Sequence, residues 1–513
     1  MRILLFGLLL VLGVATPARA EWRKAVSPSF IVYGDMKEAE LLAFTQRVER
    51  FDTVLRRRFK IGGDSAPVRL TIFLVGGGID VGKLKGTPGR SIKGFYTIGP
   101  NGPMAVSQRT RASSQFEVDA DTVLFHEYTH HFMFQYFPAP YPDWFVEGFA
   151  EFYLTARFDR EGRAELGKPA YHRGYSLAVG EQLPAATMLT ARISDLKEAQ
   201  IASLYARGWI LFHYLQFAPE RAGQFEKYVL AINKNVAPRE AGEQAFGDLA
   251  KLDKDLAAYQ NARRIKFVGE LNPTPVPAGI QVTTLDAAES AVVMDRLNMM
   301  QGMNDEQRGQ ALASLSAKRA TFPKSAPVAA LLAQVHYEAE DYDSAKSAAD
   351  AALALDPANA HAQLYKGMAE MRVLLKNDIV DPARWKAARA QLVKANRANP
   401  EDPYPLYHYY RSCRDQGIRV PPIASEGLAK ALTLLPADPR MRFDFINYLI
   451  AEKRYPAALS HARLLLLAPH GQGDNPSTRT MIRDLEYAVT NNGRFDVHPN
   501  LLPVRDRVLL LNA

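Results

Sequence analysis

The sequence has 513 residues, of which 47% are hydrophobic and 23% are charged, the balance of an ordinary globular protein. This length allows two to four domains and a large buried core. The formal net charge of +8 comes from dispersed Lys and Arg, and the short cluster at 56–58 has the size of a solvated helix face, so we expect no nucleic-acid partner.

Residues 1–20 have the pattern of a signal peptide. Arg2 provides a positive start, residues 3–14 are apolar, and Ala18-Arg19-Ala20 has the small-x-small form that signal peptidase cleaves. The apolar run is short for a membrane span, although a retained anchor is the alternative. We therefore expect cleavage after Ala20, a periplasmic or secreted protein, and no transmembrane anchor in the mature chain. Removal of Arg2 and Arg19 would leave a net charge of 8 − 2 = +6.

The first third of the mature chain alternates between strand and helix patterns. A strand is expected within 22–34, a helix over 36–60 and a strand over 68–75, where apolar residues run almost without interruption. Residues 94–107 form a predicted hairpin with Pro-Asn-Gly-Pro at its turn.

A helix predicted over 117–137 carries the strongest chemical signal, His126-Glu127-x-x-His130. Two histidines four residues apart lie on one face of a helix, so both imidazoles can reach one metal ion. Glu127 lies about 100° round the same helix, which would let it act as general base toward a metal-activated water. His131 points off the ligand face and is expected to pack instead.

A second helix, predicted over 144–155 with Asp143 as its N-cap, supplies carboxylates. Glu147 and Glu151 are four residues apart and share a face. We predict Glu147 as the third metal ligand and Glu151 as the acceptor of a hydrogen bond from a ligand histidine, with the reverse assignment left open. Three protein ligands and one open position are typical of a catalytic zinc site, so Zn²⁺ is the predicted cofactor.

The segments HEYTH at 126–130 and WFVEGFAE at 144–151 together resemble the gluzincins of the peptidase MA-like group. In that family the third ligand is a Glu in an E-G-x-A helix, which matches Glu147. The resemblance covers roughly 22–260 and implies a zinc peptidase with a zincin-like α+β domain. The chain lacks the G-A-M-E-N motif of the aminopeptidase branch, which favours an endopeptidase.

A peptidase site also needs a donor for the developing oxyanion and a place for the substrate backbone. We favour Tyr205 as the donor, because it opens an apolar helix that resembles one following the Glu helix in these peptidases. The hairpin segment Met104–Ser107 is a candidate edge strand for an extended peptide, and a plain structural hairpin is the alternative. The other candidate oxyanion donors are Tyr171, His172, Tyr175 and His213.

Residues 272–283 are predicted to be a Pro-rich linker, and 284–513 a helical repeat domain. Ala-rich helices end at recurring prolines, with an insertion around 376–382, and the segment 326–357 matches the tetratricopeptide pattern best. The only cysteine, Cys413, lies here, which excludes an intramolecular disulfide and gives little support to a catalytic thiol. The recurring prolines are Pro323, Pro357, Pro400, Pro436 and Pro469.

The predicted architecture is thus an α+β zincin-like metallopeptidase domain at 21–271 followed by an all-α tetratricopeptide-like superhelix. The predicted function is that of an exported Zn²⁺-dependent peptidase that hydrolyses peptides or proteins, with Glu127 as base and the repeats recruiting a substrate or a partner protein. The alternative is a non-catalytic, repeat-based binding protein with a peptidase-like platform. The ligands alone also fit a zinc hydrolase with a non-peptide substrate.

Overall fold

The computed structural model describes residues 21–491, apart from 64, 77–78, 80, 87–91, 110–113, 115, 263–264 and 467–474. The expected signal peptide and Pro469 lie outside the described residues. Within them, no helix combines the length and the apolar character needed to cross a membrane.

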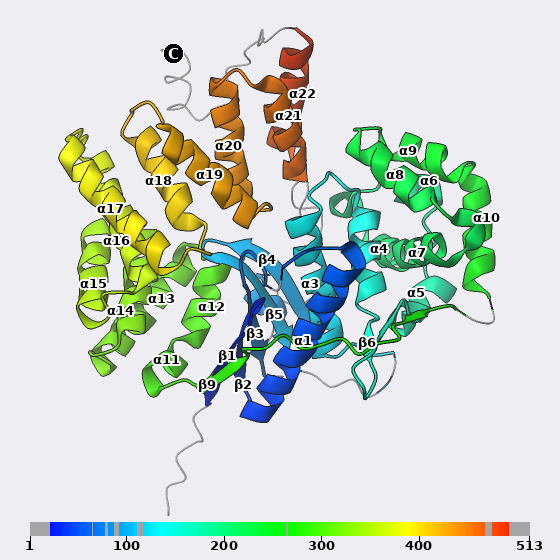
Figure 1. The fold of residues 1–513 in the computed structure, drawn as a ribbon, viewed down its shortest axis with the longest axis horizontal. Helices are drawn as coiled ribbons and strands as arrows, with labels where there is room; N and C mark the ends of the chain where they lie inside the picture. Colours follow the sequence, from blue (N-terminus) through cyan, green and yellow to red (C-terminus); the bar gives the residue numbers. More distant parts are fainter. Residues whose placement is uncertain are drawn as a thin grey trace, which may run out of the picture.

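A six-stranded mixed sheet forms the centre of the N-terminal half, in the order β4-β5-β3-β2-β1-β9 (Figure 1). The pairs β2–β3 and β3–β5 are parallel, and the remaining pairs are antiparallel. The strands are β1 Trp22–Val26, β2 Phe30–Asp35, β3 Leu70–Val75, β4 Gly94–Gly99, β5 Gly102–Gln108 and β9 Gln281–Thr284.

The predicted hairpin is present, but Met104–Ser107 is not an edge strand. It lies in β5, which pairs with β3 on one side and with β4 on the other, so its backbone groups are already used in the sheet. The edge at this end of the sheet is β4. The sequence reveals a hairpin but not which of its two strands pairs with β3, because that parallel pairing joins residues about thirty apart in the chain.

Helices cover both faces of the sheet, which explains why every residue of β3 is buried. On one face, Leu70 and Ile72 pack with α1 (Glu38–Phe59) and α3 (Ala120–Tyr136). On the other face, Phe73 packs with α12 (Val293–Gln301), beside the short helix α2 (Val81–Leu84).

The predicted boundary between the halves therefore needs correction. Residues 281–284, expected to end the linker, form β9 and pair with β1. Leu297 and Met300 of α12, expected to open the repeats, are buried in the core of the sheet's second face. The sequence of a single strand or helix does not show which domain core the element packs into. This boundary is therefore visible only from the tertiary contacts.

A helical lobe lies on the opposite side of the sheet from the first repeat helices (Figure 1), and it includes a small sheet in the order β6-β7-β8. Two of its helices, α4 and α7, cross each other at close range. The elements are α4 Asp143–Tyr153, β6 Arg157–Phe158, β7 Ala164–Leu166, α5 Gly174–Ala178, α6 Ala185–Met188, α7 Glu198–Phe217, α8 Gln224–Asn233, α9 Pro238–Phe246, α10 Leu249–Gln260 and β8 Val268–Gly269.

The crossing of α4 and α7 is closed by two glycines. A Cβ atom on Gly148 would lie 2.5 Å from the backbone oxygen of Gly208, and one on Gly208 would lie 2.8 Å from the oxygen of Trp144. The two backbones therefore touch without side chains between them. Because Gly148 follows Glu147 directly, this contact sets the position of the predicted third ligand.

The C-terminal half is an all-α succession of antiparallel helix pairs, which curve around the β4 end of the sheet in Figure 1. Prolines 323, 357, 400 and 436 each follow one helix and precede the next, as expected. The insertion at 376–382 lengthens α16 and α17 and their loop. The helices are α11 Ala287–Ala291, α13 Asp305–Thr321, α14 Ala326–Glu338, α15 Tyr342–Leu355, α16 Ala360–Lys376, α17 Pro382–Ala398, α18 Tyr404–Asp415, α19 Pro422–Leu434, α20 Pro439–Ala451, α21 Tyr455–Arg463 and α22 Pro476–Thr490.

We predict that Gly148→Ala destabilises the fold by about 1–3 kcal/mol, because its methyl group meets backbone atoms that no rotamer change can move. Gly309→Ala is the matched control: Gly309 lies inside α13 with open space around its Cα, so Ala should stabilise by roughly 0.5–1 kcal/mol. Urea denaturation would measure both. A midpoint for Gly148→Ala at or above that of the wild type would contradict the close crossing.

Candidate metal centre

The helix that carries the two histidines is α3, capped by Asp119, whose side chain accepts a hydrogen bond from the Thr122 amide at 2.8 Å. It begins at Ala120, three residues later than expected, because this cap fixes the first turn. It ends at Tyr136, before Pro138. Nearly all of its side chains are buried because α3 lies between the sheet and the helical lobe.

A buried polar network ties α3 to α1. The Tyr128 hydroxyl donates to Asp52 at 2.5 Å, and Asp52 also accepts from Arg56 at 2.7 Å and from Ser29 at 2.9 Å. With three donors on one carboxylate, the charge of Asp52 is compensated inside the core. The network fixes the rotation of α3 about its axis, and so the direction of its ligand face.

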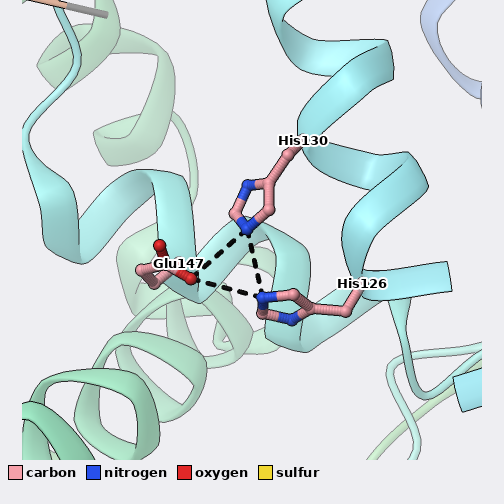
Figure 2. Close-up of side chains that lie close together, drawn as sticks. All are labelled: His126, His130 and Glu147. Carbon is pink, nitrogen blue, oxygen red and sulfur yellow. Dashed lines mark hydrogen bonds and ion pairs between the residues drawn. The ribbon is translucent and has the colours of Figure 1, made fainter. Parts of the chain in front are cut away.

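The structure brings His126, His130 and Glu147 together, with one atom of each pointing to a common centre (Figure 2). The two Nε2 atoms are 3.1 Å apart. The Glu147 Oε2 atom lies 3.3 Å from Nε2 of His126 and 3.4 Å from Nε2 of His130. Glu147 comes from α4, whose N-cap is Pro142; Asp143, expected in that role, is instead the first helical residue and accepts from the Ile193 amide at 2.8 Å.

These separations fit a small transition-metal ion. Ligand atoms about 2.1 Å from a tetrahedral ion lie about 3.4 Å from one another, close to all three observed distances. Two imidazole nitrogens and a carboxylate oxygen are also the donor set that such an ion accepts. His130 and Glu147 are fully buried, while His126 is 8% exposed, so among these three ligands the partial opening to solvent is on the His126 side.

Glu151 lies one turn after Glu147 and contacts the other side of the His126 ring. Its Oε1 atom is 3.4 Å from Nδ1 of His126, as a carboxylate that orients a ligand histidine would be. The same carboxylate is held by Arg173 through two bonds of 2.7 and 3.0 Å, and by Nε2 of His172 at 2.9 Å. The geometry thus favours Glu147 as the ligand and Glu151 behind His126.

The site has a strongly anionic character. Burial by itself would raise the pKa of Glu151, but the Arg173 guanidinium and the hydrogen bond from His172 hold that pKa well below its usual range. Burial lowers the pKa of His126, yet the hydrogen bond to Glu147 and the charges of Glu151 and Glu127 outweigh it and raise this pKa. An environment that favours a protonated imidazole also favours a bound cation.

Tyr205 of α7 borders the centre. Its ring stacks on the His126 ring at 6.0 Å between centroids, and its hydroxyl bonds to Glu147. Burial, and then the charge of Glu147, raise the pKa of Tyr205 well above its usual value, so the hydroxyl remains a donor at neutral pH. The Arg173 guanidinium also lies over the Tyr205 ring, 4.9 Å from its centroid.

The structure gives the other candidate oxyanion donors different surroundings. His213 is buried elsewhere, between the Tyr259 hydroxyl and the carbonyls of Gly167 and Lys266. His172 is engaged by Glu151, and Tyr171 and Tyr175 are 45% and 75% exposed. His131 packs as expected, with Nδ1 at 3.1 Å from the Tyr96 hydroxyl of β4.

Arg173 is the site residue that the sequence did not reveal. It lies in a short 3₁₀ turn, Tyr171–Arg173, more than twenty residues after Glu151 and outside any periodic pattern. A buried carboxylate predicts that some cation must accompany it, but not which one.

Comparison with known proteins adds little to this geometry. No family model and no curated protein matches the chain. Among solved structures, a thermophilic TPR protein from Thermus thermophilus aligns at 16% identity and a TM-score of 0.33, over 39% of this chain and 100% of its own. PilF of Pseudomonas aeruginosa aligns at 20% identity and a TM-score of 0.30, over 44% and 98%.

The geometry predicts unequal effects of two carboxylates on metal affinity. Glu151→Gln should weaken Zn²⁺ binding roughly 10- to 100-fold, because it loosens the orientation of His126, and Glu147→Gln should weaken it further, because it removes a ligand. Competition with a fluorescent chelator would measure both, with the exposed Glu161→Gln as control. A larger loss for Glu151→Gln would reverse the two roles.

The position of His213 predicts a loss of stability in acid. The pKa of His213 is lowered to about 4, because the effect of burial outweighs the opposing effect of the hydrogen bonds to the Gly167 and Lys266 carbonyls. The unfolded chain takes up this proton first, near pH 6.5, so the stability contributed by neutral His213 is present above that pH and is lost as the pH falls toward 4. The loss should be about 2 kcal/mol between pH 7 and pH 5.

Urea denaturation with a metal chelator present, which removes any contribution from metal release, would test this. The free energy of unfolding of His213→Gln should change less over the same pH interval than that of the wild type. Identical pH dependence in the two proteins would show that His213 does not titrate in this way.

Proposed function

We propose that the chain is an exported zinc-dependent peptidase, a function supported most directly by the convergence of His126, His130 and Glu147 on one point. The export part of the proposal rests on the signal-peptide pattern of residues 1–20. A zinc ion held by these three ligands would acidify a bound water and polarise the scissile carbonyl. The protein groups around the ion would supply the remaining chemistry.

Glu127 is the general base of the proposed reaction. It follows the ligand His126 on α3, and its charge contributes to raising the pKa values of both His126 and Tyr205, so the carboxylate lies among the groups that would face the substrate. It would accept the proton of the attacking water and return it to the leaving amine. Tyr205 would donate its hydroxyl proton in a hydrogen bond to the developing oxyanion.

The edge strand β4 is where an extended substrate would lie in this proposal. It is the outermost strand on the α3 side of the sheet, and its Tyr96 is hydrogen-bonded to His131, the residue that follows the ligand His130. A peptide that adds to this edge would run beside the metal ligands, with its backbone held by main-chain hydrogen bonds. Selectivity for peptides over other hydrolysable substrates would follow.

Burial of the site favours a second candidate, a binding protein whose repeats hold a partner and whose N-terminal half is a platform. Glu147 is fully buried and Glu127 is 6% exposed, so a substrate needs an opening beside His126. The observation that favours hydrolysis over this candidate is the position of Glu127 next to the candidate ligands, because a platform has no need of a base there.

We predict that Glu127→Gln lowers peptide hydrolysis by at least about 100-fold, because an amide cannot accept the proton of the attacking water. Zinc should remain bound, because residue 127 is not one of the three predicted metal ligands. Mass spectrometry would compare the peptides produced by the mature wild type and by the variant. The exposed Glu181→Gln should cut as the wild type does.

Zinc content measured on the same samples separates the two candidates. A ratio near one zinc per chain in both proteins, with cleavage by the wild type alone, supports the peptidase. A ratio near zero, or cleavage that persists in Glu127→Gln, is evidence against the proposed mechanism.

A further inference from the structure

The turn between β4 and β5 enters the concave side of the helical repeats. Four alternate helices of the repeats, α14, α16, α18 and α20, each direct one polar side chain at residues 99–101 of this turn (Figure 1 shows the helices in succession). These side chains are Gln334, Tyr365, Tyr404 and Arg440.

Gln334 and Tyr365 are both hydrogen-bonded to the side chain of Asn101. Its amide nitrogen donates to Oε1 of Gln334 at 2.7 Å, and its amide oxygen accepts from the Tyr365 hydroxyl at 2.8 Å. Both partners are buried, at 0% and 3% exposure, so these hydrogen bonds are shielded from competing water. An Asn side chain is thereby recognised through its donor and its acceptor at once.

Tyr404 and Arg440 are hydrogen-bonded to the backbone of Gly99. The Gly99 carbonyl oxygen accepts hydrogen bonds from the Arg440 guanidinium at 2.9 Å and from the Tyr404 hydroxyl at 3.0 Å. The same Tyr404 hydroxyl is also hydrogen-bonded to the Asp438 carboxylate. Asp438 is fully buried and pairs with Arg440 at 2.6 Å, so the arginine is charge-compensated where it meets the turn.

The fit at Gly99 is also steric. A Cβ atom there would lie 1.5 Å from the carbonyl oxygen of Met300 in α12, so no side chain can occupy this position. Two cavities of about 310 and 360 Å³ border the turn: Asn101 and Tyr404 line the first, and Pro100 and Tyr404 line the second.

The same turn is connected to the candidate metal centre. β4 begins beside α3 and ends in the turn, and midway along it Tyr96 bonds to His131 of α3. A shift of the turn within the repeats would therefore move the edge strand relative to the metal-ligand helix.

We propose that the concave face of the repeats is a receptor for the chain's own β4–β5 turn, and that this docking holds β4 in position beside the metal centre. The turn acts as a tethered ligand, because the sheet that carries it belongs to the same folded chain as the repeats. A free partner peptide binds the concave face only by displacing it. Only the catalytic consequence rests on the proposed peptidase function.

Hydrogen exchange of the β4 amides in the full mature chain tests the docking. Tyr365→Phe removes the bond to Asn101 and should speed exchange in residues 94–99 roughly 3- to 10-fold. Tyr410→Phe is the matched control, since Tyr410 is equally buried in the repeats but donates to the Asp444 carbonyl, away from the turn. It should leave β4 exchange unchanged.

Asn101→Ala provides the test from the other side of the contact and removes two bonds by truncating a turn side chain. Its effect and that of Tyr365→Phe should be less than additive in the double variant, because both remove the same bond. Unchanged β4 exchange in both single variants, or equal acceleration by Tyr410→Phe, would overturn the proposal.

A peptidase assay on the same variants tests the consequence for catalysis. If the wild type cuts peptides, kcat/KM for an extended substrate should fall several-fold in Tyr365→Phe and stay unchanged in Tyr410→Phe. A wild type that cuts nothing counts against the proposed function alone, because the exchange measurements still decide whether the repeats hold the turn.

Discussion

Burying negative charge beside two imidazoles is the constraint on which the rest of this structure depends. Glu147 and Glu151 are 0% and 1% exposed, and a carboxylate so far from water is costly unless positive charge accompanies it. Arg173 compensates Glu151 through two hydrogen bonds. At Glu147 the Nε2 atoms of His126 and His130 lie 3.3 and 3.4 Å away instead, so positive charge on or between these groups would balance the carboxylate.

Holding those groups within about 3.4 Å of one another demands rigid support on both helices. On the α3 side, the buried Asp52 network fixes the ligand face against α1. On the α4 side, the glycine contact with α7 brings Glu147 close and places Tyr205 next to it. Each support lies outside the metal motif, and each is a contact between segments distant in the chain.

The two halves of the molecule are joined more closely than a linker implies. α12, near the start of the helical half, closes the second face of the sheet, and β9 forms the sheet's far edge. At the other end, the repeats hold the tip of β4 by hydrogen bonds from four helices. The repeat half thus contacts the end of the strand that lies beside the candidate metal centre.

The sequence alone determined what depends on local spacing: the helix with His126 and His130, the Glu147–Glu151 face, the long helix α1, the buried strand β3 and the prolines that separate the repeat helices. It did not determine that β4 rather than Met104–Ser107 is the edge strand of the sheet, that His213 lies away from the site, or that Arg173 forms an ion pair with Glu151. Nor did it place residues 281–301 with the sheet. Helix and turn patterns arise between neighbours a few residues apart, whereas strand order, close helix crossings and charge pairing arise between segments that only the folded chain brings together.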